Sequence, residues 1–166
     1  MAITVTVGGA SSNSYITLAD WQTYWSDRNI DLTAHGHDDS HNANLIQAAD
    51  FLDRNYGWVG YRQYQTQSMA WPRITNLYVD GWPINEDTIP QRLKDAQAEL
   101  AYLIHEGLTP WATITGSVKR TMSKAGPVET ETEYLGGKTT PRLRAIEGLI
   151  APLLNAGVGQ VRLGRG

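Results

Sequence analysis

The segment around residues 90–106 carries the sequence pattern that most constrains how this chain can fold. Its apolar side chains recur every three or four residues, which is the spacing of one face of an α-helix. Pro90 stands near the first helical position, where its missing N–H would be unpaired in any helix, and Gly107 follows as a stop signal. The pattern predicts an amphipathic helix with a buried stripe of Leu93, Ala96, Leu100, Leu103 and Ile104.

Three further segments show the same periodicity and predict helices over residues 18–28, 42–55 and 141–154. Thr17 is a favourable N-cap for the first of these, and Asp20 places a carboxylate near the positive helix end. Pro152 should kink or fray the last turn of the final helix. The sequence therefore predicts a mainly α fold, a small four-helix bundle. The inward side chains are expected to be Leu18, Trp21, Trp25, Leu45, Ala49, Leu52, Tyr56, Leu143, Ile146, Leu149, Ile150 and Leu153.

The segments between these helices have less regular patterns. Residues 2–7 alternate like a short strand or arm and end at Gly8-Gly9. Residues 31–44 are polar and predict a loop. Residues 56–89 are interrupted by Pro and Gly but rich in aromatic side chains, so they predict an ordered, irregular segment wrapped on the helices.

Residues 117–134 predict one β-hairpin, because two arms alternate at period two around Lys124-Ala125-Gly126-Pro127. Loop length sets the register and leaves two alternatives open. A three-residue loop places Lys119 opposite Glu131, whereas a two- or four-residue loop places Arg120 there. Both faces are polar, so we expect the hairpin to project from the bundle and to be held by a partner.

One domain is expected over residues 1–156, followed by a flexible glycine-rich tail at residues 157–166. The 166 residues include 14 Lys plus Arg and 17 Asp plus Glu, a net charge of -3. Proteins that hold nucleic acid through its phosphates usually carry a basic surplus, which is absent here. The chain has no cysteine, which excludes disulfides and thiolate zinc sites. No apolar run reaches the roughly 18–20 residues of a membrane helix, so no membrane partner is expected.

The chain shows no phosphate-binding glycine loop and no nucleophile elbow, so we expect neither a catalytic residue nor a cofactor. His35, His37 and His41 are the strongest metal candidates. No helix-spaced pair of ligands accompanies them, which favours a solvated loop and no metal site. Glu129, Glu131 and Glu133 are interpreted as a strand facing water or a basic surface, since catalytic carboxylates need burial in a cleft.

Two short segments interleave aromatic residues with arginine, namely Tyr61-Arg62-Gln63-Tyr64 and Trp71-Pro72-Arg73. Such a pattern can stack single-stranded bases. Because large aromatic side chains dominate small cores, we expect packing instead for Tyr61, Tyr64, Trp71 and Trp82.

Several segments, taken in order, resemble one family of tailed-bacteriophage proteins. The resemblance covers roughly residues 1–155 and ends with a basic strand that turns through Gly-Pro into an acidic strand near Tyr134. The chain is similar to small head–tail connectors, also called adaptors or neck proteins, some of which are labelled DnaT-like single-stranded DNA-binding proteins. The segments that carry the resemblance are Ser12–Asp20, Leu45–Asp53, Tyr56–Gly60, Gln67–Arg73 and Ile89-Pro90.

This resemblance implies a structural virion protein with no catalytic residues. Twelve copies would form a ring between portal and tail that continues the DNA channel. The expected partners are other copies of the chain, the portal protein, a tail terminator, stopper or other neck protein, and genomic DNA passing without sequence-specific contacts. The expected location is the virion neck, after synthesis in the host cytoplasm. The alternative is a DnaT-like single-stranded DNA-binding protein of phage replication.

Two sets of residues are predicted to bind partner subunits. In the hairpin, basic residues on one arm and acidic residues on the other would form ion pairs between neighbouring copies. In the tail, aliphatic anchors and arginines would dock into a partner ring. The hairpin set is Lys119, Arg120, Lys124, Glu129, Glu131 and Glu133, and the tail set is Val158, Val161, Arg162, Leu163 and Arg165.

Overall fold

The computed structural model describes residues 2–32, 38–111 and 143–155, together with the backbone of four short strands between residues 114 and 139. By its contacts the chain divides into two compact units. The first consists of Met1–Leu108 and Leu143–Gly166, and the second of Thr109–Arg142. All the described helices belong to the first unit.

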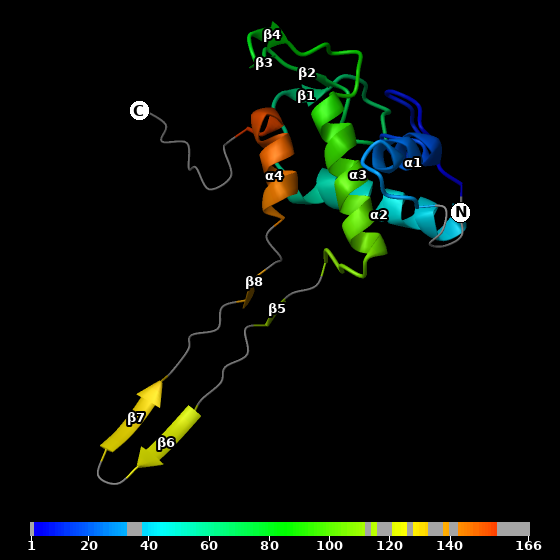
Figure 1. The fold of residues 1–166 in the computed structure, drawn as a ribbon. Helices are drawn as coiled ribbons and strands as arrows, with labels where there is room; N and C mark the ends of the chain where they lie inside the picture. The colour runs from blue at the N-terminus through cyan, green and yellow to red at the C-terminus, as the bar shows by residue number, and fades with distance from the viewer. Residues whose placement is uncertain are drawn as a thin grey trace, which may run out of the picture. The chain divides into compact units, whose positions relative to one another are not determined.

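The four predicted helices are present in the described residues, as α1 (Leu18–Ser26), α2 (Asp38–Asn55), α3 (Gln91–His105) and α4 (Arg144–Ile150) (Figure 1). The mainly α prediction is therefore confirmed for the first unit. Helix α3 is central, since it packs against each of the other three. Helix α4 gives way directly to a 3-10 turn, η1 (Ala151–Leu153), as expected from the proline within it. None of the described helices has the length and apolar character needed to cross a membrane.

Local signals explain where these helices begin and what they bury. The backbone N–H of Asp20 donates to Thr17 Oγ1 over 3.1 Å, and the backbone N–H of Thr17 donates to Asp20 Oδ2 over 3.0 Å. This reciprocal pair is a capping box, and it satisfies two N–H groups at the start of α1. The core stripes agree with the predicted ones, except that Leu103 in the last turn of α3 is 37% exposed. The fully buried members are Trp21, Leu45, Ala49, Leu52, Leu93, Ala96, Leu100, Ile146, Ile150 and Leu153.

Helix α2 begins at Asp38, earlier than predicted, so the prediction of a loop over 31–44 is wrong for its last seven residues. Asp38 and Asp39 lie in the first turn, where carboxylates favour the positive end of the helix. His41 is buried, and its ring meets the edges of Trp21 and His105, with centroids 5.3 Å away in each case. The described residues contain no group of three side chains that could hold a metal, whereas His35 and His37 lie outside them.

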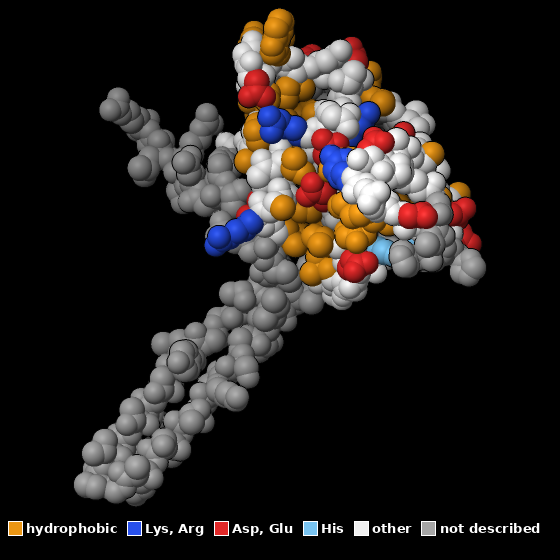
Figure 2. Space-filling view, viewed as in Figure 1, with side chains coloured by type: hydrophobic (Ala, Val, Ile, Leu, Met, Phe, Trp, Pro, Cys, Tyr) orange, Lys and Arg blue, Asp and Glu red, His pale blue; other side chains and the backbone are white. Residues whose placement is uncertain are grey.

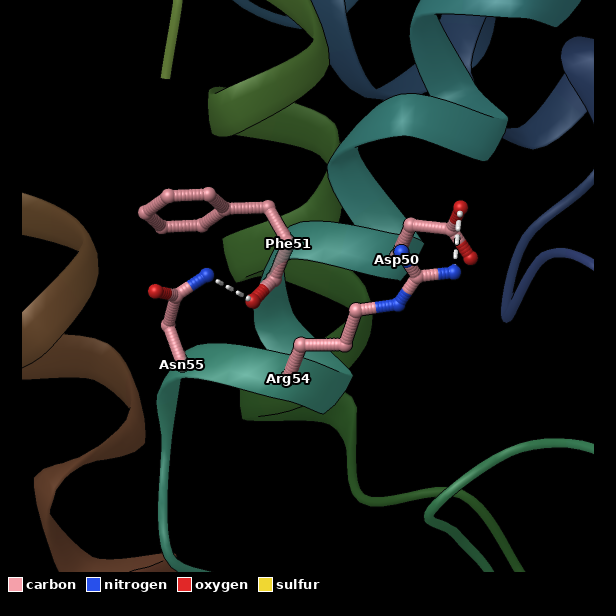
Figure 3. A network of polar contacts seen from close by, with 4 residues as sticks. All are labelled: Asp50, Phe51, Arg54 and Asn55. Carbon is pink, nitrogen blue, oxygen red and sulfur yellow. Dashed lines mark hydrogen bonds and ion pairs between the residues drawn. The ribbon is translucent and has the colours of Figure 1, made fainter. Parts of the chain in front are cut away.

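The end of α2 is held by its own side chains (Figure 3). Asn55 Nδ2 donates to the backbone oxygen of Phe51 over 3.0 Å, which occupies a carbonyl in the last turn. Arg54 and Asp50, one turn apart, form an exposed ion pair of 3.3 Å. Such pairs stabilise a helix by about 0.3–0.5 kcal/mol.

Residues 2–7 do not form the predicted strand. Side-chain oxygens replace the partner strand: Thr4 N–H donates to Asn13 Oδ1 over 2.8 Å, and Thr6 N–H donates to Ser12 Oγ over 3.1 Å. The chain reverses between these pairs through Gly8, which has a φ of 70°. Because Ser and Asn side chains compete with backbone partners in this way, the alternating pattern produces a closed turn and no sheet.

Residues 56–89 are ordered and mostly irregular, as predicted. They contain two pairs of two-residue strands, β1 (Tyr61–Arg62) with β2 (Arg73–Ile74) and β3 (Tyr78–Val79) with β4 (Trp82–Pro83). Figure 1 shows these strands together at the end of the helical unit where α3 begins.

The second unit contains two strand pairs, β5 (Ile114–Thr115) with β8 (Lys138–Thr139) and β6 (Thr121–Ala125) with β7 (Val128–Thr132). The β6–β7 pair confirms the predicted hairpin, but both predicted registers are wrong. Met122 faces Glu131, and Lys124 faces Glu129. The ladder closes at Ala125 and Val128, so the turn is centred one residue later than the prediction assumed.

A buried polar network joins the parts of the first unit. The hydroxyl of Tyr15 donates to Asp53 Oδ1 and accepts the backbone N–H of Trp71 at 3.3 Å. The other carboxylate oxygen, Asp53 Oδ2, accepts the backbone N–H of Ala70 at 2.8 Å. Burial raises the pKa of Asp53 and of Tyr15. Through these bonds, α2 is tied to the N-terminal segment and to the chain that precedes β2.

Gln97 extends the network into α3, where its side chain is fully buried. Its Oε1 accepts the backbone N–H of Tyr15 at 2.9 Å. Its Nε2 donates to Ser14 Oγ over 2.7 Å and to the backbone oxygen of Leu45 over 2.9 Å. The oxygen and both N–H groups of this amide have protein partners, and these hydrogen bonds offset the cost of removing the amide from water.

Tyr15→Phe should lower the free energy of unfolding by about 1–3 kcal/mol, because Asp53 and the N–H of Trp71 each lose a buried partner. The Tyr15 hydrogen bond lowers the pKa of Asp53, which means that it stabilises the ionised carboxylate. The loss should therefore be larger at about pH 8 than at about pH 4, because the raised pKa of Asp53 favours its protonated form at the lower pH. Urea unfolding of both proteins at the two pH values measures this difference. Equal losses at both would contradict an ionised Asp53 in the network.

Candidate nucleic-acid interface

Four aromatic side chains of residues 61–82 face solvent, although the sequence analysis predicted burial for three of them. Tyr61 and Tyr78 are each 64% exposed, Tyr64 is 44% exposed and Trp82 is 77% exposed. We call these four residues together the aromatic face, a name for their shared exposure and not for one flat surface. Of the side chains predicted to pack, Trp71 alone does so, with 1% exposed. Tyr and Trp combine a large apolar ring with a polar tip, which suits side chains that are exposed until a ligand covers them.

Tyr61 is positioned by a clamp that Arg73 forms under β1. The guanidinium donates to three backbone oxygens, those of Val59 at 2.6 Å, Ala70 at 3.1 Å and Gly60 at 2.5 Å. Burial lowers the pKa of Arg73, but its three acceptors occupy the fork of the side chain. Arg73 therefore shapes the loop, with three of its five N–H donors bonded to the backbone.

Close packing against glycines fixes the neighbouring turn. A Cβ on Gly8 would lie 2.5 Å from the ring of Tyr64, so only glycine lets the N-terminal turn approach this ring. The backbone N–H of Ser68 donates to the oxygen of Gly9 over 3.1 Å, and its hydroxyl donates to the oxygen of Ser12 over 2.6 Å. Tyr64 is thus held between its own turn and the N-terminal segment while part of its ring stays exposed.

The β3–β4 hairpin carries the most exposed ring. Its turn is Asp80-Gly81, with φ of 54° and 85°, as tight two-residue hairpins require. Trp82 pairs with Val79 and Tyr78 with Pro83, so the two rings project from opposite faces of the hairpin. The Asp-Gly pair between two apolar dipeptides is a hairpin signal that the sequence analysis missed.

Charges of both signs accompany the aromatic face. Arg62 is exposed between Tyr61 and Tyr64. Arg92 of α3 reaches the hairpin turn, where its Nη2 lies 3.0 Å from Asp80 Oδ2. Figure 2 shows basic and acidic side chains side by side near the apolar cluster over the β3–β4 hairpin. The surface therefore offers rings and a few cations, and it has no broad basic groove in this view.

A cavity of about 320 Å³ lies between α1 and α3. Asp20, Asp27 and Asp95 line it, and the guanidinium of Arg28 lies 3.5 Å from the centre of the Tyr24 ring. Burial, together with the adjacent Glu99, raises the pKa of Tyr24 to about 12. Arg28 and Lys94 line the cavity as well, so its charges are mixed and it shows no cluster of cations for phosphates.

The structure does not describe the side chains of the residues that were predicted to bind partner subunits. Lys124, Glu129 and Glu131 lie in β6 and β7, where the structure describes backbone pairing alone. The others lie outside the described residues, namely Lys119, Arg120, Glu133, Val158, Val161, Arg162, Leu163 and Arg165. Their roles in binding stay predictions.

A family model described as "Putative DnaT-like ssDNA binding protein" matches residues 1–166, the full length of the chain. Comparison with curated proteins and with solved structures gives no match.

This match contradicts the head–tail adaptor prediction and supports the alternative, a DnaT-like single-stranded DNA-binding protein. No finding supports a portal protein, a tail protein or a ring of subunits as partners. The net charge of the chain, which argued against DNA, concerns affinity for phosphates and does not bear on base stacking. The location in the virion neck depended on the adaptor hypothesis and has not been tested.

Arg73→Lys should destabilise the loop that carries Tyr61, because one ammonium group cannot replace a fork bonded to three carbonyl oxygens. The expected loss in the free energy of unfolding is about 1–3 kcal/mol. Arg62→Lys is the matched control, since Arg62 is exposed on the paired strand and its replacement should change stability by less than about 0.5 kcal/mol. Thermal unfolding compares the two variants. Equal losses in both would show that Arg73 is not a clamp.

Proposed function

We propose that this chain, which belongs to the DnaT-like ssDNA binding protein family, binds single-stranded DNA by stacking unpaired bases on its aromatic face. The observation that carries the proposal is the exposure of Tyr61, Tyr64, Tyr78 and Trp82 within 22 residues of the chain. Tyr61 and Tyr64 precede a stretch of buried residues, Gln67 and Met69–Pro72, which packs into the helical unit.

Base stacking supplies the attraction. A base stacked on an aromatic side chain contributes about 1–3 kcal/mol, and any base can take part because each has a π-face. Tyr and Trp suit this role, since their rings lose little conformational entropy when a ligand covers them. The proposed binding therefore has little sequence preference.

The same geometry favours single strands over duplexes. In duplex DNA the faces of the bases are covered by their neighbours, and only base edges are open in the grooves. Side chains that stack need bases that are already unpaired, because extruding one costs a few kcal/mol.

The electrostatic contribution is small in this proposal. Arg62 and Arg92 are the cations beside the rings, and each cation that neutralises a phosphate changes the slope of log K against log salt by about −0.7 on single strands. Two such contacts give a slope no steeper than about −1.4. A protein that held DNA mainly by its phosphates would show a much steeper dependence.

The test is fluorescence anisotropy of a labelled oligothymidine titrated with protein, for the wild type and for Trp82→Ala. Loss of one stacking ring should weaken binding by about 5- to 100-fold, which corresponds to about 1–3 kcal/mol. Leu103→Ala is the matched control, because Leu103 is an exposed apolar side chain 11 residues after Arg92 on α3. It should bind like the wild type.

Two results would contradict the proposal. One is a wild-type protein that does not bind the oligonucleotide even at low salt. The other is binding that Trp82→Ala and Tyr61→Ala leave unchanged. The proposal requires no chemical reaction, and the expectation that the chain is not an enzyme stays a prediction.

A further inference from the structure

The turn of the β3–β4 hairpin places a carboxylate directly on one of the two cations of the proposed DNA site. Asp80 Oδ2 lies 3.0 Å from Arg92 Nη2, and the Asp80 side chain is 78% exposed. The Arg92 side chain is 41% exposed, so a ligand that passes the turn can reach it. No other ion pair is described between this segment and α3 among the residues that the structure covers.

The local structure of α3 does not favour an arginine at position 92. It lies in the first turn of α3, which contains no acidic side chain and has no side-chain cap. A cation near the positive end of a helix is unfavourable. Asp80 offsets this by bringing a negative charge to the same turn from outside the helix.

The position of the pair matters because Tyr78 and Trp82 project from opposite faces of the hairpin. A single strand that stacks on both rings has to pass around the hairpin, and Asp80 and Arg92 lie at its turn. A phosphate arriving there meets a guanidinium that already has an anionic partner. Carboxylate and phosphate compete for the same planar fork of donors.

Resting on the proposed function, we infer that Asp80 limits the affinity of the site by holding Arg92, and that DNA binds by exchanging this carboxylate for a phosphate. Binding then gains less from Arg92 than a free arginine would give. The pair keeps the affinity moderate and lowers its salt dependence, and Asp80 is the residue that sets both.

The turn offers a substitution that removes the charge and keeps the shape. Asn-Gly is at least as favourable as Asp-Gly where both turn residues have positive φ, so Asp80→Asn should preserve the hairpin. Arg92→Gln is the matched partner. Both variants break the ion pair equally, but Asp80→Asn leaves a free cation and Arg92→Gln leaves a free anion.

The experiment measures oligothymidine affinity and its salt slope for the wild type, the two single variants and the double variant. Asp80→Asn should bind about 3- to 10-fold tighter at low salt, with a slope steeper by about 0.7. Arg92→Gln should bind more weakly than the wild type. In the Arg92→Gln background, Asp80→Asn should leave the slope unchanged, because no freed arginine remains. Melting temperatures check that all four proteins are folded.

Three results would overturn the inference. If both single variants bind more weakly, the pair is a tether that shapes the hairpin. If Asp80→Asn tightens binding and steepens the slope equally in both backgrounds, Asp80 acts through its own charge. If Asp80→Asn binds like the wild type while Trp82→Ala loses binding, this inference fails and the proposed function stands. Absence of binding by all the proteins would instead refute the proposed function.

Discussion

The bond between Tyr15 and Asp53 is the interaction on which the rest of the first unit depends. A buried carboxylate is tolerated only with good partners, because its charged form loses the solvation of water. Here the partners come from the N-terminal segment and from Ala70, while Gln97 of α3 holds the backbone of Tyr15. The requirement to satisfy one buried group therefore fixes the positions of segments that are distant in sequence.

The irregular chain that carries the aromatic face depends on the same anchor. It is tied at residues 70 and 71 to the network, at Arg73 to three carbonyl oxygens, and at Ser68 to the N-terminal turn. Gln67 adds a buried amide that bonds to the backbone of Met69 and Pro72. These bonds hold residues 67–73, beside Tyr61 and Tyr64, whereas Tyr78 and Trp82 lie further along the chain on the β3–β4 hairpin. At Tyr61 and Tyr64 a ligand would bind next to a backbone that is already held, which lowers the ordering cost.

The helices could be predicted from the sequence because their burial follows a local period, and the stripe of α3 was correct in its main positions. The turn at residues 2–13 could not, because the side chains of Ser12 and Asn13 took the place of a partner strand. Burial of Tyr61, Tyr64 and Trp82 was wrongly predicted, since composition shows how many large rings a chain has and not which ones its core can hold. Net charge could not decide between the two functions, because it bears on attraction to phosphates and not on the exposure of rings that stack bases.

The central claim is that single-stranded DNA lies on the aromatic face, and photo-crosslinking tests it most directly. The wild-type protein is irradiated with an oligothymidine, and the crosslinked peptides are identified by mass spectrometry. The account predicts that the adducts fall on Tyr61, Tyr64, Tyr78 and Trp82, and that unlabelled single strands compete for them better than duplex does. Adducts confined to other parts of the chain, such as Thr109–Arg142, would contradict it.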